Sequence, residues 1–386
     1  MKKNLVPRVR FKGFDEEWKE EKFGELLFRI NEKGYEWLET LTASKSGEML
    51  KRKSINYHIQ VAKESLKNYN RVLKNDFVLH LSTYESGLAY SKEIGITSPA
   101  YDVLRFFDKN NNDPIFFKYV FSNKKFINSL VPFTYGLRQG KSINLEELNK
   151  SLIEKTNISE QQKIGKLLEN IDNLISLEEI KLNKLKQLKK TLLQKMFSEG
   201  NSKVPRIRFR GFDEEWKGER LESFSEITIG EFVIKTKQND FYEYPVYNGG
   251  ITNTGFYKEY NNEGNKIIVS ARGANAGYIN FSEKRYWAGN SCYSIDLISK
   301  RHSNIKFIFY SMLTNKYKFD DTKQVGTIPS VSLEDVKNFV IYLSSYSEQR
   351  KIGDFFSKID NLINLYQSKL NKLQQIKEAL LQKTFI

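Results

Sequence analysis

Two stretches of nearly the same sequence decide how this chain is organised. Residues 159–175 read SEQQKIGKLLENIDNLI and residues 347–363 read SEQRKIGDFFSKIDNLI, with 11 of 17 positions identical at a constant offset of 188 residues. Residues 182–195 (LNKLKQLKKTLLQK) and 370–383 (LNKLQQIKEALLQK) match at 10 of 14 positions at the same offset. Matches this dense indicate an internal duplication.

Apolar residues in both stretches recur every seven residues, with a second apolar position in between. This pattern predicts two long amphipathic helices, from about Ser159 to Phe197 and from Ser347 to the C-terminus, that pair as a coiled coil. At about 1.5 Å per residue the first would be about 58 Å long. The alternative is that each helix packs separately on its own globular neighbour. The predicted helix-pairing residues are Ile164, Leu167, Ile171, Leu174, Leu185, Leu188, Leu192, Ile352, Phe355, Ile359, Leu362, Tyr366, Leu373, Ile376 and Leu380.

The predicted seam is interrupted half-way along both helices. Glu178 and Lys181 interrupt it in the first copy, and Tyr366 and Lys369 in the second. We therefore expect something other than a dry two-helix contact at this point.

A second repeat precedes each globular part. Residues 6–19 (VPRVRFKGFDEEWK) and 204–217 (VPRIRFRGFDEEWK) match at 12 of 14 positions, so the chain is built twice as motif, globular block and long helix. The blocks, 20–158 and 218–346, hardly resemble each other. Both mix strand-like runs with a helix, which predicts α+β units. The predicted domains are residues 1–158 and 201–346, with helical spacers at 159–200 and 347–386.

Charge points to a polyanionic partner. The 386 residues carry 62 Lys and Arg against 47 Asp and Glu, a formal charge of +15, which favours nucleic acid. An anionic membrane surface is the weaker alternative, because there is no run of 18 apolar residues and no apolar segment after the N-terminal MKKN. The single cysteine, Cys292, excludes an internal disulfide or a cysteine-based metal cluster. We expect a cytoplasmic protein that does not bind membranes.

No motif gives a positive reason to expect catalysis. Residues 136–142 (GLRQGKS) approach a phosphate-binding loop, but only three residues separate the two glycines and no apolar strand feeds the loop. His58, His80 and His302 are far apart and lack ligand-like spacing with carboxylates. We predict no catalytic residue, no metal site and no cofactor in this chain.

Loops of the two blocks carry side chains of the kinds that read bases. Arg and Lys bond guanine edges, Asn and Gln bond adenine edges, and hydroxyls bond either. A solvated loop residue is an equally good interpretation for any one of them, whereas the groups as wholes favour DNA contact. The predicted DNA-binding residues are Ser82, Tyr84, Ser86, Arg138, Gln139, Lys141 and Ser142 in the first block, and Tyr247, Asn248, Asn253, Arg272, Asn275, Lys323 and Gln324 in the second.

With two diverged blocks on a duplicated scaffold, the chain resembles the specificity subunit of a type I restriction-modification enzyme. The resemblance covers essentially the whole chain. It is carried by the SEQQKIG and SEQRKIG helix starts, the repeated IDNLI, the LLQK helix ends and residues 326–341 (GTIPSVSLEDVKNFVI). The first block departs from the pattern, because residues 140–153 (GKSINLEELNKSLI) lack the Thr-Ile-Pro sequence.

The resemblance implies two target-recognition domains separated by two long antiparallel coiled-coil helices, in a pseudo-twofold repeat. Each domain would read one half of a bipartite site in double-stranded DNA, and the helices would set the spacer. Half-sites one turn apart lie about 34–36 Å from centre to centre, which a helix of about 58 Å can span. The implied partners are two methylation subunits, which bind S-adenosylmethionine, and motor-nuclease subunits, which use ATP and magnesium. The subunit itself would catalyse nothing.

Two other functions remain open at this stage. One is a non-catalytic coiled-coil scaffold that binds other proteins or anionic surfaces, which two diverged basic domains fit less well. The other is a nuclease or methyltransferase, which requires a carboxylate or cofactor constellation that the sequence does not offer.

Overall fold

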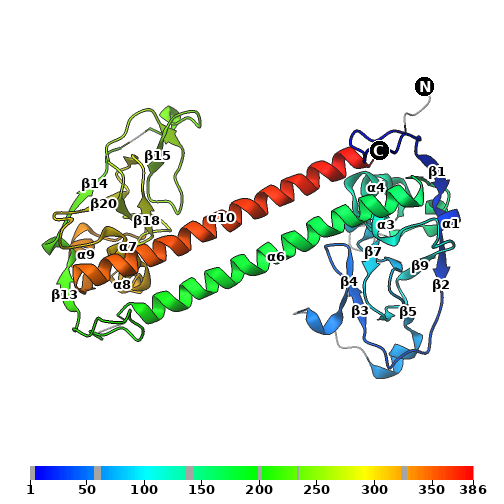
Figure 1. Cartoon of the computed structure of the whole chain (residues 1–386), viewed down its shortest axis with the longest axis horizontal. Coiled ribbons are helices and arrows are strands. Elements are labelled where there is room, and N and C mark those ends of the chain that lie inside the picture. Colours follow the sequence, from blue (N-terminus) through cyan, green and yellow to red (C-terminus); the bar gives the residue numbers. More distant parts are fainter. Residues whose placement is uncertain are drawn as a thin grey trace. The chain divides into compact units, whose positions relative to one another are not determined.

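The computed structural model describes residues 5–55, 62–135, 142–198, 202–232, 234–322 and 328–385. The chain forms two compact units: unit 1 consists of Met1–Glu179 with Lys369–Ile386, and unit 2 of Ile180–Ser368. Two helices of 39 residues, α6 (Ile158–Met196) and α10 (Tyr346–Thr384), therefore contribute to both units (Figure 1). Both begin one residue before the predicted start. The predicted domain boundaries stay predictions.

Unit 1 is built around a six-stranded sheet in the order β2-β9-β6-β7-β4-β3 (Figure 1). Neighbouring strands are antiparallel, except β4 and β7, which are parallel. Two-stranded pairs β1-β12, β5-β8 and β10-β11 complete the unit. Its elements before α6 are β1 (Lys19–Lys22), α1 (Phe23–Leu26), β2 (Leu27–Ile30), β3 (Leu41–Ala43), β4 (Glu48–Lys51), β5 (Asn70–Val72), β6 (Phe77–Leu79), α2 (Thr83–Ser86), β7 (Ala89–Ser91), β8 (Gly95–Thr97), β9 (Asp102–Phe106), α3 (Pro114–Ser122), α4 (Lys124–Ser129), β10 (Thr134–Tyr135), β11 (Ser142–Ile143), α5 (Leu145–Leu148) and β12 (Leu152–Lys155).

Unit 2 contains a four-stranded sheet in the order β14-β20-β17-β18, a three-stranded sheet in the order β16-β15-β19, and the pair β13-β21. Between α6 and α10 its elements are β13 (Lys217–Arg220), β14 (Ser225–Ile229), β15 (Tyr244–Tyr247), β16 (Phe256–Tyr257), β17 (Lys266–Ser270), β18 (Ile279–Ser282), β19 (Trp287–Ala288), β20 (Cys292–Leu297), α7 (Ile305–Thr314), α8 (Tyr317–Thr322), α9 (Leu333–Lys337) and β21 (Val340–Leu343).

The two blocks share a strand order that their sequences do not reveal. The run β2-β9-β6-β7 in unit 1 corresponds to β14-β20-β17-β18 in unit 2, and every neighbouring pair in both runs is antiparallel. The second strand of each run, β9 or β20, leads into the block's main helix, α3 or α7. Both units mix sheet and helix, so the α+β class is confirmed.

The start of each long helix is anchored by a buried ion pair with the preceding sequence motif. The fully buried Glu160 accepts hydrogen bonds from Arg10 Nε and Nη2 at 2.7 and 2.8 Å. Glu348, also fully buried, accepts the same two bonds from Arg208 at 2.9 and 2.8 Å. This bidentate geometry, with two parallel N–H···O bonds, is the strong form of an arginine–carboxylate contact. It explains why the entry motif and the helix start are repeated together.

The residues that follow this glutamate fix the block's main helix. Gln161 Oε1 accepts the Asp113 N–H at 2.8 Å, and Gln349 Oε1 accepts the Asn304 N–H at 3.0 Å. These two donors belong to the residues that cap α3 and α7. A Cβ on Gly165 would lie 2.8 Å from a backbone nitrogen in the first turn of α3, so the close approach of α6 requires glycine.

Each long helix buries a stripe whose steps alternate between four and three residues. The predicted apolar positions between the heptad residues, such as Leu167 and Phe355, lie one residue before the buried positions. The sequence does not decide between them, because adjacent apolar pairs such as Leu167-Leu168 and Phe355-Phe356 fit both spacings. Phe355 is half-buried against the core of unit 2. Leu167, Leu174, Leu188, Leu362 and Ile376 are 37–50% exposed and lie outside the stripe. The stripe consists of Ile164, Leu168, Ile171, Ile175, Glu178, Leu182, Leu185, Lys189, Leu192 and Met196 in α6, and of Ile352, Phe356, Ile359, Ile363, Tyr366, Leu370, Leu373, Lys377, Leu380 and Thr384 in α10.

The repeated aspartate of IDNLI joins three elements within each unit. In unit 1, Asp172 on α6 accepts a hydrogen bond from the Tyr119 hydroxyl at 2.8 Å and lies 2.5 Å from Lys377 Nζ on α10. The tyrosine comes from the block helix α3, so one carboxylate ties the block to both long helices. The equivalent residues in unit 2 are Asp360, Tyr310 and Lys189, at 2.7 and 2.5 Å.

A buried charge occupies the place where the seam was predicted to falter. Glu178 is 2% exposed and lies 2.8 Å from Lys369 Nζ, whose side chain is about half exposed. The stripe of unit 1 therefore contains an ion pair at this point.

Replacing Arg10 tests the anchoring ion pair. We expect Arg10→Met to destabilise unit 1 by about 3 kcal/mol, because it leaves the fully buried Glu160 carboxylate without its countercharge. Arg10→Met combined with Glu160→Met should recover most of that loss. Urea unfolding followed by tryptophan fluorescence measures both. Arg8→Met, at an exposed arginine of the same motif, is the control and should change stability by less than about 0.5 kcal/mol. Equal effects of Arg8→Met and Arg10→Met would contradict the account.

Candidate nucleic-acid interface

Three loops of unit 2 meet where β17 ends and β20 begins. Asn248, after β15, accepts the Ser291 N–H through Oδ1 at 3.2 Å, and the Ser291 carbonyl accepts the Ala271 N–H at 2.8 Å. Ser270 Oγ lies 3.4 Å from the Gly250 carbonyl, to which it donates. The loops after β15, after β17 and before β20 therefore form one surface, here called the unit 2 loop cluster (residues 248–253, 271–277 and 289–291).

Arg272 and Asn275 lie on the middle loop of this cluster. Arg272 is exposed and Asn275 is half-buried. The turn is held because the Gly273 N–H donates to the Pro329 carbonyl at 2.9 Å, and Arg272 forms a backbone bridge with Ser330. A guanidinium and an amide, presented on a fixed turn, are suited to guanine and adenine edges.

The structure gives other predicted contact residues a packing role as well. The Tyr247 ring packs edge-on against Tyr286 at 5.6 Å, it is half-buried, and burial raises the pKa of its hydroxyl. Asn253 Nδ2 donates to the Gly255 carbonyl at 3.2 Å, within its own turn. Asn248 supports the cluster through Ser291. Of these three residues, only Asn248 connects through Ser291 to the loop that carries Arg272 and Asn275.

In unit 1 the predicted residues gather around the short helix α2. Ser82 precedes α2, Tyr84 and Ser86 lie on it, and α2 packs against α4 and β11, which begins at Ser142. Ser82 is exposed, whereas Tyr84 and Ser86 are half-buried. The turn at residues 82–86 and the start of β11 are therefore neighbours. Arg138, Gln139 and Lys141 of the first block, and Lys323 and Gln324 of the second, lie outside the described residues.

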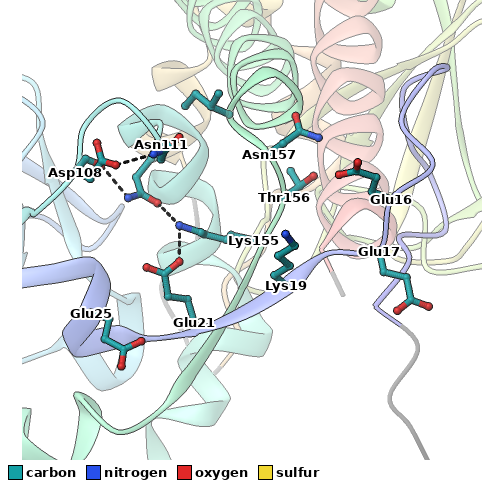
Figure 2. A pocket seen from close by; sticks show the side chains of 12 residues that line it. Glu16, Glu17, Lys19, Glu21, Glu25, Asp108, Asn111, Lys155, Thr156 and Asn157 are labelled. Carbon is teal, nitrogen blue, oxygen red and sulfur yellow. Dashed lines mark hydrogen bonds and ion pairs between the residues drawn. The ribbon is translucent and has the colours of Figure 1, made fainter.

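A polar hollow of about 430 Å³ lies elsewhere in unit 1 (Figure 2). Lys155 bonds Glu21 across it at 2.5 Å, and Glu16 and Glu17 project from the entry motif (Figure 2). A similar hollow in unit 2 is lined by Asp213 and its neighbouring glutamates. Surplus carboxylates repel phosphate, so neither hollow is suited to the DNA backbone.

The described part of the chain has no side-chain cluster of the kind that holds a metal ion, which would be a group of three or more His, Cys, Asp or Glu residues. Burial raises the pKa of the Cys292 thiol to about 12, so this residue is a poor nucleophile. No helix within the described ranges is long and apolar enough to cross a membrane.

Comparison with known proteins agrees with this arrangement. Residues 213–375 match the family model described as the type I restriction modification DNA specificity domain. A Mycoplasma genitalium protein named as a type I specificity subunit is 30% identical over 249 residues, covering 60% of each chain. A Mycoplasma pneumoniae protein of the same description is 28% identical over 166 residues, covering 43% of each chain. The chain is therefore similar to type I specificity subunits, and residues 213–375 carry the match to the family model.

A solved structure supports the fold of the chain. The crystal structure of the type I restriction-modification S subunit from M. genitalium matches with a TM-score of 0.69 and 19% identity, and the match covers 99% of both chains. The sequence alignments reach less far: they span 60% and 43% of the length of the two Mycoplasma relatives.

Sequence reasoning missed the loop before β20, which supplies part of the unit 2 loop cluster. Asn290 is exposed there, beside Ser291. The available signal was the polar run Gly-Asn-Ser at 289–291, directly before the strand Cys292–Leu297. The loops at Asn248 and Arg272 have the same form of polar residues beside a strand end.

Removal of the Arg272 side chain tests the unit 2 loop cluster. We expect Arg272→Ala to lower affinity for the cognate DNA about tenfold or to relax one base position, because a guanidinium that bonds a guanine contributes about 1–3 kcal/mol of discrimination. Arg301→Ala, beyond the far end of β20, is the matched exposed control. Fluorescence anisotropy with duplexes carrying single base-pair changes measures the effect. Unchanged affinity and selectivity would remove Arg272 from the interface.

Proposed function

We propose that this chain is the DNA-specificity subunit of a type I restriction-modification complex, in which each block reads one half of a bipartite site in double-stranded DNA. The observation that carries the proposal is the shared strand order under diverged loops. Two blocks with the same four-strand run present different side chains, Arg272 and Asn275 in one and the turn at 82–86 in the other. Two different reading surfaces on one scaffold suit an asymmetric target.

Charge supports DNA as the ligand. The net charge of +15 favours phosphate contacts, which supply affinity that weakens with salt, while loop side chains supply sequence discrimination. The alternative of a coiled-coil scaffold that binds other proteins or anionic surfaces explains neither the diverged loops nor the family match.

The long helices are proposed to pair antiparallel as a coiled coil that sets the spacer between half-sites. Contacts within unit 1 support this direction: Glu178 meets Lys369, whereas Asp172, six residues earlier, meets Lys377, eight residues later. Within unit 2, Lys189 meets Asp360 in the same sense. The contacts of Asp172 and Asp360 are copies of each other, which supports the pseudo-twofold repeat.

Exposed leucines on the helices support docking of two methylation subunits. Leu174 and Leu177 of α6 are 45% and 52% exposed in unit 1, and their counterparts Leu362 and Leu365 of α10 are 44% and 63% exposed in unit 2. A duplicated apolar surface suits two copies of one partner, because each copy meets the same side chains. The chain itself is proposed to be non-catalytic. S-adenosylmethionine, ATP and magnesium are assigned to the methylation and motor-nuclease subunits of a cytoplasmic complex.

Block exchange tests the proposed division of labour. Replacing residues 218–346 with the corresponding block of another specificity subunit should change one half of the methylated motif and leave the other half and the spacer intact. The reciprocal exchange of residues 20–158 should change only the other half. Adenine-methylation sequencing of cells that contain the matching methylation subunit measures both. A change in both halves from a single exchange would contradict modular reading.

Substitution of the exposed leucines tests docking. Leu174→Gln with Leu177→Gln should release one of two methylation subunits, and adding Leu362→Gln with Leu365→Gln should release the second. The fold should persist, because all four side chains are roughly half exposed. Native mass spectrometry measures the stoichiometry, with Lys166→Gln on an exposed face of α6 as the control. Retention of both subunits by the fourfold variant would place docking elsewhere.

A further inference from the structure

The turn at residues 82–86 is held from within by one buried side chain, His80. His80 follows β6 and is 7% exposed. Its Nδ1 accepts the Ser82 N–H at 3.3 Å, and its Nε2 lies 3.3 Å from Ser86 Oγ. The imidazole therefore contacts both the first and the last residue of the turn.

The hydrogen bonds of the turn fix the tautomer of this ring. Nδ1 accepts from Ser82, so it carries no proton. Ser86 Oγ donates its own hydrogen to the Ser82 carbonyl at 3.2 Å, which leaves the oxygen free to accept from His80 Nε2–H. Burial lowers the pKa of His80 to about 4, so the ring is neutral near pH 7. The neutral ring thus accepts the Ser82 N–H through Nδ1 and donates to Ser86 Oγ through Nε2–H.

The backbone around the ring is equally constrained. The His80 N–H donates to Thr83 Oγ1 at 2.7 Å, and the His80 carbonyl accepts the Thr83 N–H at 3.0 Å. Behind the turn, Gly87 has a φ of +76°, and a Cβ there would lie 1.9 Å from the Phe121 carbonyl oxygen. The turn is thus fixed by His80 on one side and by α3 on the other, while Ser82 and Glu85 remain exposed.

We propose that His80 is a positioning residue for DNA recognition, which holds the turn at 82–86 in the conformation that reads the first block's half-site. The inference rests on the proposed function, since it assumes that this turn meets DNA. His80 itself does not touch a base. It acts by keeping the backbone of the turn fixed, so that the exposed side chains meet the base edges without first losing conformational freedom.

Paired substitutions at one position separate positioning from simple core packing. His80→Leu fills the site but offers no acceptor to the Ser82 N–H, whereas His80→Asn places an amide oxygen near the position of Nδ1. The readout is the methylation rate of the complete complex on duplexes with one base-pair change in either half-site. Block exchange establishes which half-site belongs to residues 20–158.

His80→Leu should reduce discrimination against wrong base pairs about tenfold in the first block's half-site and leave the other half-site unchanged. His80→Asn should return discrimination to within about threefold of the unsubstituted chain. Ser86→Ala removes the hydroxyl that joins His80 Nε2 to the Ser82 carbonyl and leaves the bond from the Ser82 N–H to Nδ1 in place. It should produce a smaller loss, and it is the deciding variant if His80→Leu does not fold.

Full discrimination in His80→Leu, or in Ser86→Ala where that variant decides, would overturn the proposal. Equal losses in both half-sites, or no recovery with His80→Asn, would also overturn it, because either result would mark a general structural role. Absence of any bipartite methylation by the complex that contains the unsubstituted chain would instead refute the proposed function, so the two failures are distinguishable.

Discussion

Each long helix begins with a buried glutamate, and the position of the helix on its block depends on the arginine that neutralises it. A buried carboxylate is stable in its charged form only when it is paired and hydrogen-bonded. Glu160 therefore requires Arg10, and Glu348 requires Arg208. The glutamine and glycine that follow then bring the helix against α3 or α7. These contacts account for the residues that the two halves share.

The same constraint explains where the halves differ. Residues inside the anchored scaffold meet fixed neighbours, such as the tyrosine and lysine that bond Asp172, and have little freedom to change. Loops that leave the strand ends meet solvent, so their sequences can change while β2-β9-β6-β7 and β14-β20-β17-β18 keep one order. The proposed recognition of two different half-sites rests on this separation of buried frame and exposed loops.

Sequence alone predicted the helices to within about a residue at their starts, because the heptad pattern extends over nearly 40 residues. The apolar positions between the heptad residues were predicted one residue too early, since adjacent pairs such as Leu167-Leu168 satisfy both a three-residue and a four-residue step. The sequence did not reveal the common strand order, because short strands in diverged blocks leave no repeat to align. Arg272 and Asn275 were predicted from their position after a strand, whereas the loop at Ser291 becomes part of the site only through its long-range contacts with Asn248 and Ala271.

The proposed specificity role can be tested by adenine-methylation sequencing of cells that express this chain with its cognate methylation subunit, compared with matched cells without the chain. A new split motif, with two short specific halves around an unread spacer, should appear only when the chain is present. A stable complex with the methylation subunit that yields no new motif would contradict the account and favour the scaffold role.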